Sequence, residues 1–302
     1  MTGSSSADEC VAVVHPQKSG GIAAATEKLA QWAHAHGQPA PHVVATTAES
    51  PGTEQARDAV AAGADLVLAW GGDGTVNSVA GGLAGSGVPL GILPAGTGNL
   101  LARNLGLPLG LRDAAAVAFT GRDRAIDLID IGLGGRVTTC SVMAGIGLDA
   151  VLIDAPEDLK NVIGPTAYVV NGVRAIGHRT TRFGVSIDSG PPRWYSAKSV
   201  LVANVGGLVG GLDVAPEAEV SDGRLHVVVL PLSTPLDLLR TASDLALRRP
   251  RHDTSRRHYE GRSAVIVSRE TQPRQVDGDV VEDGRRIEAR VRPGALVVRV
   301  PR

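Results

Sequence analysis

Short apolar runs alternate with helical segments through the first 131 residues of the chain. Each apolar run has the length of a buried strand, and the runs lie at Val11–His15, His42–Ala45, Asp65–Trp70, Leu90–Leu93 and Ala125–Ile131. Helices are expected between them at Ala23–His36, Thr53–Ala62 and Leu111–Phe119, each followed within two residues by a glycine that can end it. This alternation predicts a parallel sheet with crossover helices, which is an α/β domain.

The pattern changes after Ile131, where short strands separated by turn residues predominate. Leu133–Arg136 and Ser189–Pro192 have the composition of hairpin turns, and apolar runs flank both of them. Further strands are expected at Leu225–Leu230, Ala264–Ser268, Ile287–Val291 and Ala295–Val300, and one amphipathic helix at Leu159–Gly177. The second half is therefore expected to be mainly antiparallel β structure, with a domain boundary near residues 131–136.

The composition fits a globular protein and excludes several classes. Of the 302 residues, 43% are hydrophobic and 20% charged, which is enough apolar material for a sizeable core. A net charge of −1 gives no general attraction to nucleic acid, so no nucleic-acid partner is expected. The chain begins without the features of a signal peptide, and no run approaches the roughly 18 apolar residues of a membrane span. The expected location is the cytoplasm, with peripheral contact to the inner membrane surface.

A glycine-rich loop at Trp70–Asn77, WGGDGTVN, lies where a buried strand ends and a helix begins. Unpaired backbone N–H groups and the helix dipole favour an anion at such a junction, and glycines let a phosphate approach the main chain. An ordinary tight turn is the alternative interpretation. The chain has no GxxxxGK[ST] motif and no GxGxxG motif after a strand, which excludes a Walker-type NTPase and a classical dinucleotide domain.

A second glycine-rich loop, Leu93–Asn99 (LPAGTGN), follows the next strand along the chain. Open α/β sheets bind ligands at the carboxyl ends of their strands, so the two loops are expected to face one nucleotide. Arg103, one turn into the following helix, is placed to reach a phosphate, although an exposed helical arginine explains it equally well.

The segments GGDGTVNSVAGGL and LPAGTGNLLARNLGLP together resemble the catalytic domain of the diacylglycerol kinase family, in its bacterial lipid kinase branch, to which sphingosine and ceramide kinases are related. The resemblance covers residues 10–302, and further similar segments lie at His15–Gly20, Asp130–Gly132, Ala144–Asp149, Val202–Gly211, Ser221–Leu225 and Val276–Asp279. It implies an N-terminal ATP-binding α/β domain of the NAD kinase and diacylglycerol kinase type, residues 8–133 plus 286–302. It also implies a C-terminal, mainly antiparallel β-sandwich domain that accepts the lipid, residues 134–285.

The resemblance also implies roles for individual residues. The ATP-binding residues would be Gly71, Gly72, Asp73, Gly74, Thr75, Asn77, Gly96, Thr97, Gly98, Asn99 and, after the second strand, Thr47 or its neighbour Thr46. Mg²⁺ would be held by the Asp222 carboxylate and by the main-chain carbonyls of Glu219 and Arg224. Asp73 and Asp279 would be the catalytic residues, with Asp279 as general base on the lipid hydroxyl. These parts are the ones that phosphoryl transfer needs: positioning, charge neutralisation and a proton acceptor.

Several positions depart from the family pattern. The family usually has Asn at His15, Glu at Ser78, Asp at Leu100 and Glu at Asp279. From the residues alone, a solvated aspartate in a hairpin is the preferred explanation of Asp279, and its position in the family pattern is what favours the general base. Asp130 and Asp149 are expected near the cleft, where they either support water on the metal or cap local structure.

The expected function is therefore that of an ATP-dependent lipid kinase with a diacylglycerol-like acceptor. A kinase for a soluble acceptor, as in the NAD kinases that share GGDGT, is one alternative, and a weakly active nucleotide-binding regulator is the other. The basic run from Arg248 to Arg262 either contacts anionic lipid head groups or forms a solvated loop. A homodimer is left open.

Overall fold

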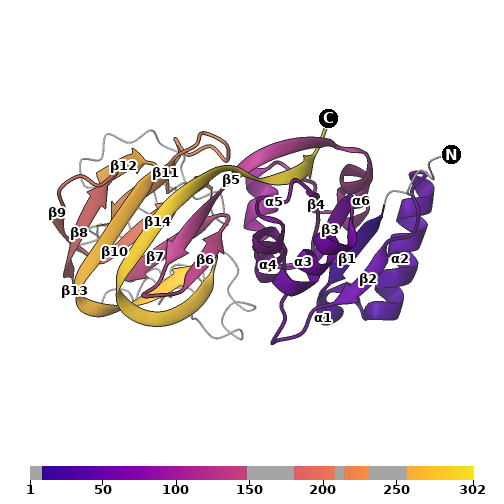
Figure 1. The fold of residues 1–302 in the computed structure, drawn as a ribbon, viewed down its shortest axis with the longest axis horizontal. Helices are drawn as coiled ribbons and strands as arrows, with labels where there is room; N and C mark the ends of the chain where they lie inside the picture. The colour runs from indigo at the N-terminus through magenta and orange to yellow at the C-terminus, as the bar shows by residue number, and fades with distance from the viewer. Residues whose placement is uncertain (1–8, 148–179, 208–213, 231–256) are drawn as a thin grey trace. The chain divides into compact units, whose positions relative to one another are not determined.

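The computed structural model describes residues 9–147, 180–207, 214–230 and 257–302, and the chain packs into two units (Figure 1). The first unit comprises Met1–Leu128 with Pro293–Arg302, and the second comprises Ile129–Arg292. Two strands, β5 (Arg122–Gly132) and β14 (Asp279–Val300), run from one unit into the other. From the sequence, the domain limits are expected at 133/134 and 285/286.

The first unit contains a parallel sheet in the order β14-β4-β3-β1-β2. Its strands β1 (Cys10–Val14), β3 (Leu66–Gly71) and β4 (Pro89–Pro94) are buried along their whole length, as strands covered on both faces are, whereas β2 (His42–Ala45) is more open. The helices of this unit are α1 (Pro16–Ser19), α2 (Ile22–Ala35), α3 (Thr53–Ala62), α4 (Asp73–Leu83), α5 (Leu100–Asn104) and α6 (Leu111–Thr120). The parallel α/β prediction for this half is confirmed, and each strand and helix expected there is present.

Small residues let the helices of this unit approach its sheet closely. A side chain at Gly91 on β4 would lie 2.6 Å from Leu68 and 2.8 Å from Ala118 of α6, so only glycine allows α6 to pack at this distance. The core cluster around β1 and β3 includes Leu29, Trp70 and Phe119 together with six alanines. The chain has few aromatic side chains, and close packing of small residues fills this core instead.

The second unit is built from antiparallel strands. One path runs β12-β11-β10-β7-β13-β14, with β8 and β9 extending from β13, and with β6 paired to β5. The strands are β6 (Val137–Cys140), β7 (Met143–Gly147), β8 (Thr181–Ile187), β9 (Arg193–Ala197), β10 (Ser199–Ala203), β11 (Leu225–Leu230), β12 (Arg257–Gly261) and β13 (Ser263–Val276). The antiparallel prediction for this half is confirmed.

The C-terminal strand corrects one detail of the sequence prediction. Ile287–Val291 and Ala295–Val300 were expected as separate short strands, but both lie within β14, which continues through Pro293-Gly294. Gly294 adopts a φ of 60°, and its N–H donates to the buried carboxylate of Asp127 at 2.8 Å. A glycine with positive φ and a satisfied amide lets the strand continue through this segment.

Some expected features lie outside the described residues. They are the helix at Leu159–Gly177, Asp149, and most of the basic run from Arg248 to Arg262. Within the described parts of the chain, no helix combines the length and apolarity needed to cross a membrane.

Candidate active site

The two glycine-rich loops lie beside each other at the carboxyl ends of β3 and β4. Gly71 at the end of β3 is in register with Pro94 at the end of β4, and the Ala95 N–H donates to the Gly71 carbonyl at 2.8 Å. The parallel pairing therefore continues one residue into the loops. The prediction that both loops meet at one edge of the sheet is confirmed.

Asp73, the first residue of α4, connects the two loops through its carboxylate. Its Oδ2 accepts the backbone N–H of Asn99 at 2.8 Å, and its Oδ1 accepts that of Leu100 at 2.6 Å. Asn99 in turn has a φ of 48°, accepts the Gly96 N–H with Oδ1 at 2.9 Å and donates to the Gly96 carbonyl at 2.7 Å. One carboxylate and one amide side chain thus hold the second loop closed on itself and against the first.

Two of the loop glycines are required by close packing, Gly71 within the first loop and Gly96 between the two loops. A side chain on Gly96 would lie 2.8 Å from the Cα of Gly72, and one on Gly71 would lie 2.5 Å from the side chain of Thr75. Sequence reasoning explained these glycines by the approach of a phosphate. In the structure, Gly71 and Gly96 already have a reason to be glycine, which is the close packing of the loops themselves.

The start of α4 has the geometry on which the predicted anion site depends. Gly72 precedes the helix in an extended conformation, and no side chain caps it. Since the first N–H groups of a helix have no partner within it, they and the helix dipole suit a phosphate. Thr97 on the second loop is exposed, whereas Thr75 is buried with only 6% of its surface accessible and packs beneath Gly71.

The structure distinguishes the two threonines after β2. Thr46 is buried, and its N–H continues the pairing with β1 by donating to the Val14 carbonyl at 2.9 Å. Thr47 is exposed, and its Oγ1 accepts the Ser50 N–H at 3.0 Å. Thr47 is therefore the one of the pair whose side chain can meet a ligand.

Arg103 and His15 each make a hydrogen bond beside the loops that the sequence did not indicate. The Nε of Arg103 donates to the Gly98 carbonyl at 2.8 Å, so this exposed arginine stabilises the second loop in addition to carrying its charge.

His15 follows β1, and its N–H donates to the Trp70 carbonyl at 2.9 Å. Its Nδ1 is buried and, within the described parts of the chain, has no hydrogen-bond partner. Nothing in the sequence indicated that the Nδ1 atom of His15 is buried.

The candidate base Asp279 begins β14, directly after a tight hairpin turn. Asp277 and Gly278 form the turn with φ values of 49° and 91°, which matches the two left-handed residues of a type I′ turn. Asp279 pairs with Val276 across the hairpin, and its side chain is exposed. The hairpin interpretation from the sequence is confirmed, while the role of Asp279 in catalysis stays a prediction.

The neighbouring Asp277, which sequence reasoning did not single out, is buried and anchors this hairpin. Its carboxylate accepts the backbone N–H groups of Ser141, Val142 and Met143 at 2.7, 2.8 and 2.8 Å, and the thiol of Cys140 at 3.2 Å. Burial raises the pKa of Asp277, while the amide donors act in the opposite direction. Its Asp-Gly sequence was already explained by the turn, so no further signal pointed to an anchor.

The candidate metal ligands lie in one turn before β11. Asp222 Oδ1 accepts the Arg224 N–H at 2.8 Å, and Oδ2 accepts the Glu219 N–H at 3.2 Å and lies 2.9 Å from Nε2 of the buried His226. The Glu219 carbonyl accepts the Asp222 N–H at 3.3 Å. Carboxylate and main-chain carbonyl oxygens are the hard donors that Mg²⁺ prefers, and the ion fills its other positions with water.

His226 connects this turn to β12 through His258. His226 Nδ1 lies 3.0 Å from His258 Nε2, and the two rings are stacked. Within the described residues, no group of three or more His, Cys, Asp or Glu side chains is placed to hold a metal ion. A metal at this turn would therefore depend on Asp222 and main-chain oxygens. Asp130, the other acidic candidate, lies 3.5 Å from Arg292 in an ion pair.

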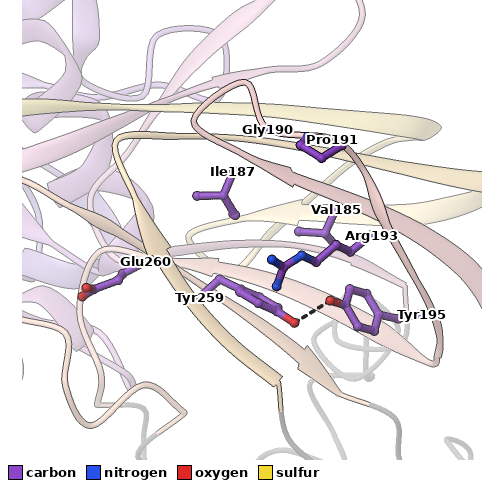
Figure 2. Close-up of a pocket in the computed structure, with 8 residues that line it drawn as sticks. All are labelled: Val185, Ile187, Gly190, Pro191, Arg193, Tyr195, Tyr259 and Glu260. Carbon is purple, nitrogen blue, oxygen red and sulfur yellow. Dashed lines mark hydrogen bonds between the residues drawn. The ribbon is translucent and has the colours of Figure 1, made fainter.

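A separate pocket of about 170 Å³ lies in the second unit between β8, β9 and β12 (Figure 2). The hydroxyl groups of Tyr195 and Tyr259 point toward one another and form a hydrogen bond, and the Arg193 guanidinium lies 5.8 Å from the centre of the Tyr259 ring. Burial and the Tyr259 hydroxyl raise the pKa of Tyr195. None of the residues predicted for the site lines this pocket.

Two family models together match nearly the whole chain. Residues 9–131 match the diacylglycerol kinase catalytic domain, and residues 141–300 match the YegS C-terminal NAD kinase beta sandwich-like domain. The chain is 34% identical over 248 residues to a protein of Pseudomonas aeruginosa named "Probable lipid kinase YegS-like", covering 81% of this chain and 79% of the relative. It is 31% identical over 218 residues to a diacylglycerol kinase of Bacillus subtilis, with 68% and 67% covered. Another relative, from Synechocystis, is 28% identical, with 78% of this chain and 58% of that protein covered.

Solved structures show the same fold. A diacylglycerol kinase from Bacillus anthracis superposes with a TM-score of 0.77 at 21% identity, covering 97% of both chains. An NAD kinase from Archaeoglobus fulgidus superposes with a TM-score of 0.52 at 12% identity, covering 96% of this chain and 93% of the other. The expected combination of an NAD kinase and diacylglycerol kinase type α/β domain with a C-terminal β-sandwich domain is confirmed.

Proposed function

Because the chain belongs to the diacylglycerol kinase family, in its YegS-like lipid kinase branch, we propose that it transfers the γ-phosphoryl group of ATP to the hydroxyl of a diacylglycerol-like lipid. Membership in this family makes it a kinase. The lipid acceptor, the metal and the general base are the parts of the proposal that go beyond family membership.

The observation that carries the proposal is the pair of hydrogen bonds that the Asp73 carboxylate accepts from backbone N–H groups of the second loop. It holds two amide-rich loops at one edge of the sheet, beside the uncapped start of α4. ATP, when bound, supplies the phosphoryl group. Its phosphates would be held by the amides of Gly72, Gly74, Thr97 and Gly98, with the Thr97 and Thr47 hydroxyl groups as side-chain donors. Preorganised amides cost no rearrangement when negative charge develops on the transferred group.

The proposed base is Asp279, and Asp277 holds it in place. An exposed carboxylate at a hairpin can accept the proton of a lipid hydroxyl, provided that the backbone carrying it does not move. The three amide hydrogen bonds to the buried Asp277 carboxylate fix that backbone two residues away. Mg²⁺ would be held by Asp222 and the carbonyls of Glu219 and Arg224, where it would neutralise phosphate charge.

Transfer of labelled γ-phosphate from ATP with Mg²⁺ to a panel of lipids in mixed micelles tests the proposal, alongside NAD and buffer alone. Label is expected on a lipid with a free hydroxyl. It should be lost in Asp279→Asn, restored in part in Asp279→Glu, and kept in Asp283→Asn, which removes an exposed carboxylate from the same strand. Label on NAD alone would indicate a kinase for a soluble acceptor, and ATP binding without any transfer would indicate a regulator.

A further inference from the structure

One face of the second unit presents arginines around an exposed tryptophan. Residues alternate between the two faces of a strand, and the register aligns Trp194 of β9 with Gly184 of β8, Val267 of β13 and Arg286 of β14. The same face of these four strands carries Arg182, Trp194, Arg269, Arg286 and Arg290, all of them exposed. We refer to these five residues as the arginine–tryptophan face.

The tryptophan on this face lies across its neighbouring strand. A side chain built on Gly184 would lie 3.2 Å from two carbons of the Trp194 indole, so glycine makes room for the ring there. The indole is nevertheless 44% exposed. The guanidinium carbons of Arg182 and Arg269 lie 5.9 and 5.7 Å from the ring centre, within the range of a cation–π interaction. The indole ring is thus held in place, bordered by two guanidinium groups and open to solvent.

The positive charge on the face is only partly balanced. Glu288 projects from β14 between Arg286 and Arg290 and pairs with Arg286 at 2.6 Å. Arg182, Arg269 and Arg290 have no ion-pair partner among the residues that the structure describes. The whole chain has a net charge of −1, so this face differs from the average of the protein.

We propose that the arginine–tryptophan face docks onto the surface of an anionic lipid bilayer, an inference that rests on the proposed lipid acceptor. Each basic residue near an anionic membrane contributes on the order of 1 kcal/mol, and tryptophan favours the interface between head groups and acyl chains. A bilayer requires no shape-matched partner, so the exposed face of a sheet suffices for docking. The acceptor lipid is itself in a bilayer, so docking raises its concentration at the enzyme.

Sedimentation with vesicles of phosphatidylcholine, and with equimolar phosphatidylcholine and phosphatidylglycerol, tests this docking. The full chain should bind the anionic vesicles and leave the neutral ones. Arg182→Gln/Arg269→Gln/Arg290→Gln should weaken binding on the order of 100-fold, since three basic residues are lost. The matched control, Arg57→Gln/Arg112→Gln/Arg122→Gln, removes the same charge from exposed positions of the first unit and should bind within a few-fold of the unmodified protein.

Fluorescence gives a second readout that does not depend on charge. Trp70 is fully buried and Trp32 half-buried, so a blue shift on anionic vesicles would come from Trp194 and should be absent in Trp194→Phe. Equal binding to both kinds of vesicle, unchanged binding of the face variant, or an equal loss in the control variant would each overturn the proposal. Thermal unfolding of every variant checks that it is folded.

Activity separates this inference from the proposed function. The face variant should retain transfer to a water-soluble short-chain diacylglycerol and lose transfer to diacylglycerol in anionic vesicles. If the unmodified protein phosphorylates no lipid, the proposed function is wrong, while vesicle sedimentation still decides the docking inference. If it phosphorylates both substrates and the face variant does so equally well, the docking inference is wrong and the proposed function stands.

Discussion

Asp73 holds Leu100 through the backbone N–H of that residue, at 2.6 Å from the carboxylate oxygen. The contact does not involve the leucine side chain. Leu100 stands where the family usually has aspartate, which raised the question of whether the site is intact. The connection between the two loops depends on the main chain at this position, so the loops keep it with leucine present.

Asp73→Asn is expected to loosen this connection and weaken nucleotide binding. An asparagine keeps one oxygen acceptor but directs an NH₂ group at the other backbone N–H, which leaves a donor unsatisfied at a cost of about 1–3 kcal/mol. Titration with a fluorescent ATP analogue should show a loss of affinity of roughly 5- to 150-fold. Asp58→Asn, an exposed change on α3, should bind normally. Unchanged affinity in Asp73→Asn would mean that the connection does not shape the nucleotide site.

Gly96→Ala is expected to force the loops apart. The added methyl would lie 2.8 Å from the Cα of Gly72, and backbone atoms cannot move aside without shifting a loop. The expected cost is about 1–3 kcal/mol of stability, together with most of the ATP affinity. Gly110→Ala is the matched control, because its methyl would meet only Asp113 at an ordinary 3.6 Å. Thermal unfolding and ATP titration of both variants distinguish a local effect from a general one.

Asp277→Asn is expected to destabilise the second unit. The wild-type carboxylate faces only donors, three of them backbone N–H groups, so an NH₂ group placed there meets a donor in either orientation. The expected loss is about 2–4 kcal/mol, measured by urea unfolding. Asp283→Asn on the exposed part of the hairpin should stay within about 0.5 kcal/mol of the unmodified protein. A similar small loss in both variants would contradict the role of Asp277 as an anchor.

The same residue gives the unfolding free energy a dependence on pH. Burial raises the pKa of Asp277 above its unfolded value of about 3.9, so the folded state binds this proton more tightly. Its contribution to stability is complete below the unfolded pKa and declines as pH rises through the folded pKa. In Asp277→Asn, unfolding free energy should therefore rise more steeply, or fall less, over that range. Parallel pH profiles for the two proteins would contradict the raised pKa.

Asp222→Ala is expected to remove stabilisation by Mg²⁺. A ligand at 100 times its dissociation constant stabilises the folded state by about 2.7 kcal/mol, and this response should disappear with the carboxylate. The comparison is between melting curves with and without Mg²⁺, because the substitution also removes the hydrogen bonds to Arg224 and His226. Asp113→Ala should retain the Mg²⁺ response. A full response in Asp222→Ala would eliminate the proposed metal position.

Local patterns predicted the fold well where burial decides the structure. The buried strands of the first unit appear as continuous apolar runs, and helix ends coincide with glycines such as Gly63, whose φ is 92°. The prediction was wrong at Pro293-Gly294, where the strand continues. The buried carboxylate of Asp127, 167 residues away in sequence, supplies the acceptor for that amide, and no local pattern contains such a partner.

The site was predictable to the extent that motifs mark the ends of strands. Both loops were located correctly because strand-to-helix junctions are readable in sequence. The contacts that shape them were not, since the bonds from Asp73 to Asn99 and from Asp277 to Ser141 span 26 and 136 residues. Nor could sequence separate Thr46 from Thr47, because the choice depends on which of the two continues the pairing with β1.

The path of β14 has a consequence for the order in which the chain folds during synthesis. The strand that pairs with β4 in the first unit comes from around Val297 and Val298, which leave the ribosome after the whole of the second unit. During synthesis of the second unit, the sheet of the first unit is therefore incomplete, because β4 lacks its pairing with β14. Exposed strand edges favour misassembly, so β4 is exposed to wrong pairing from its own synthesis until the end of β14 is made.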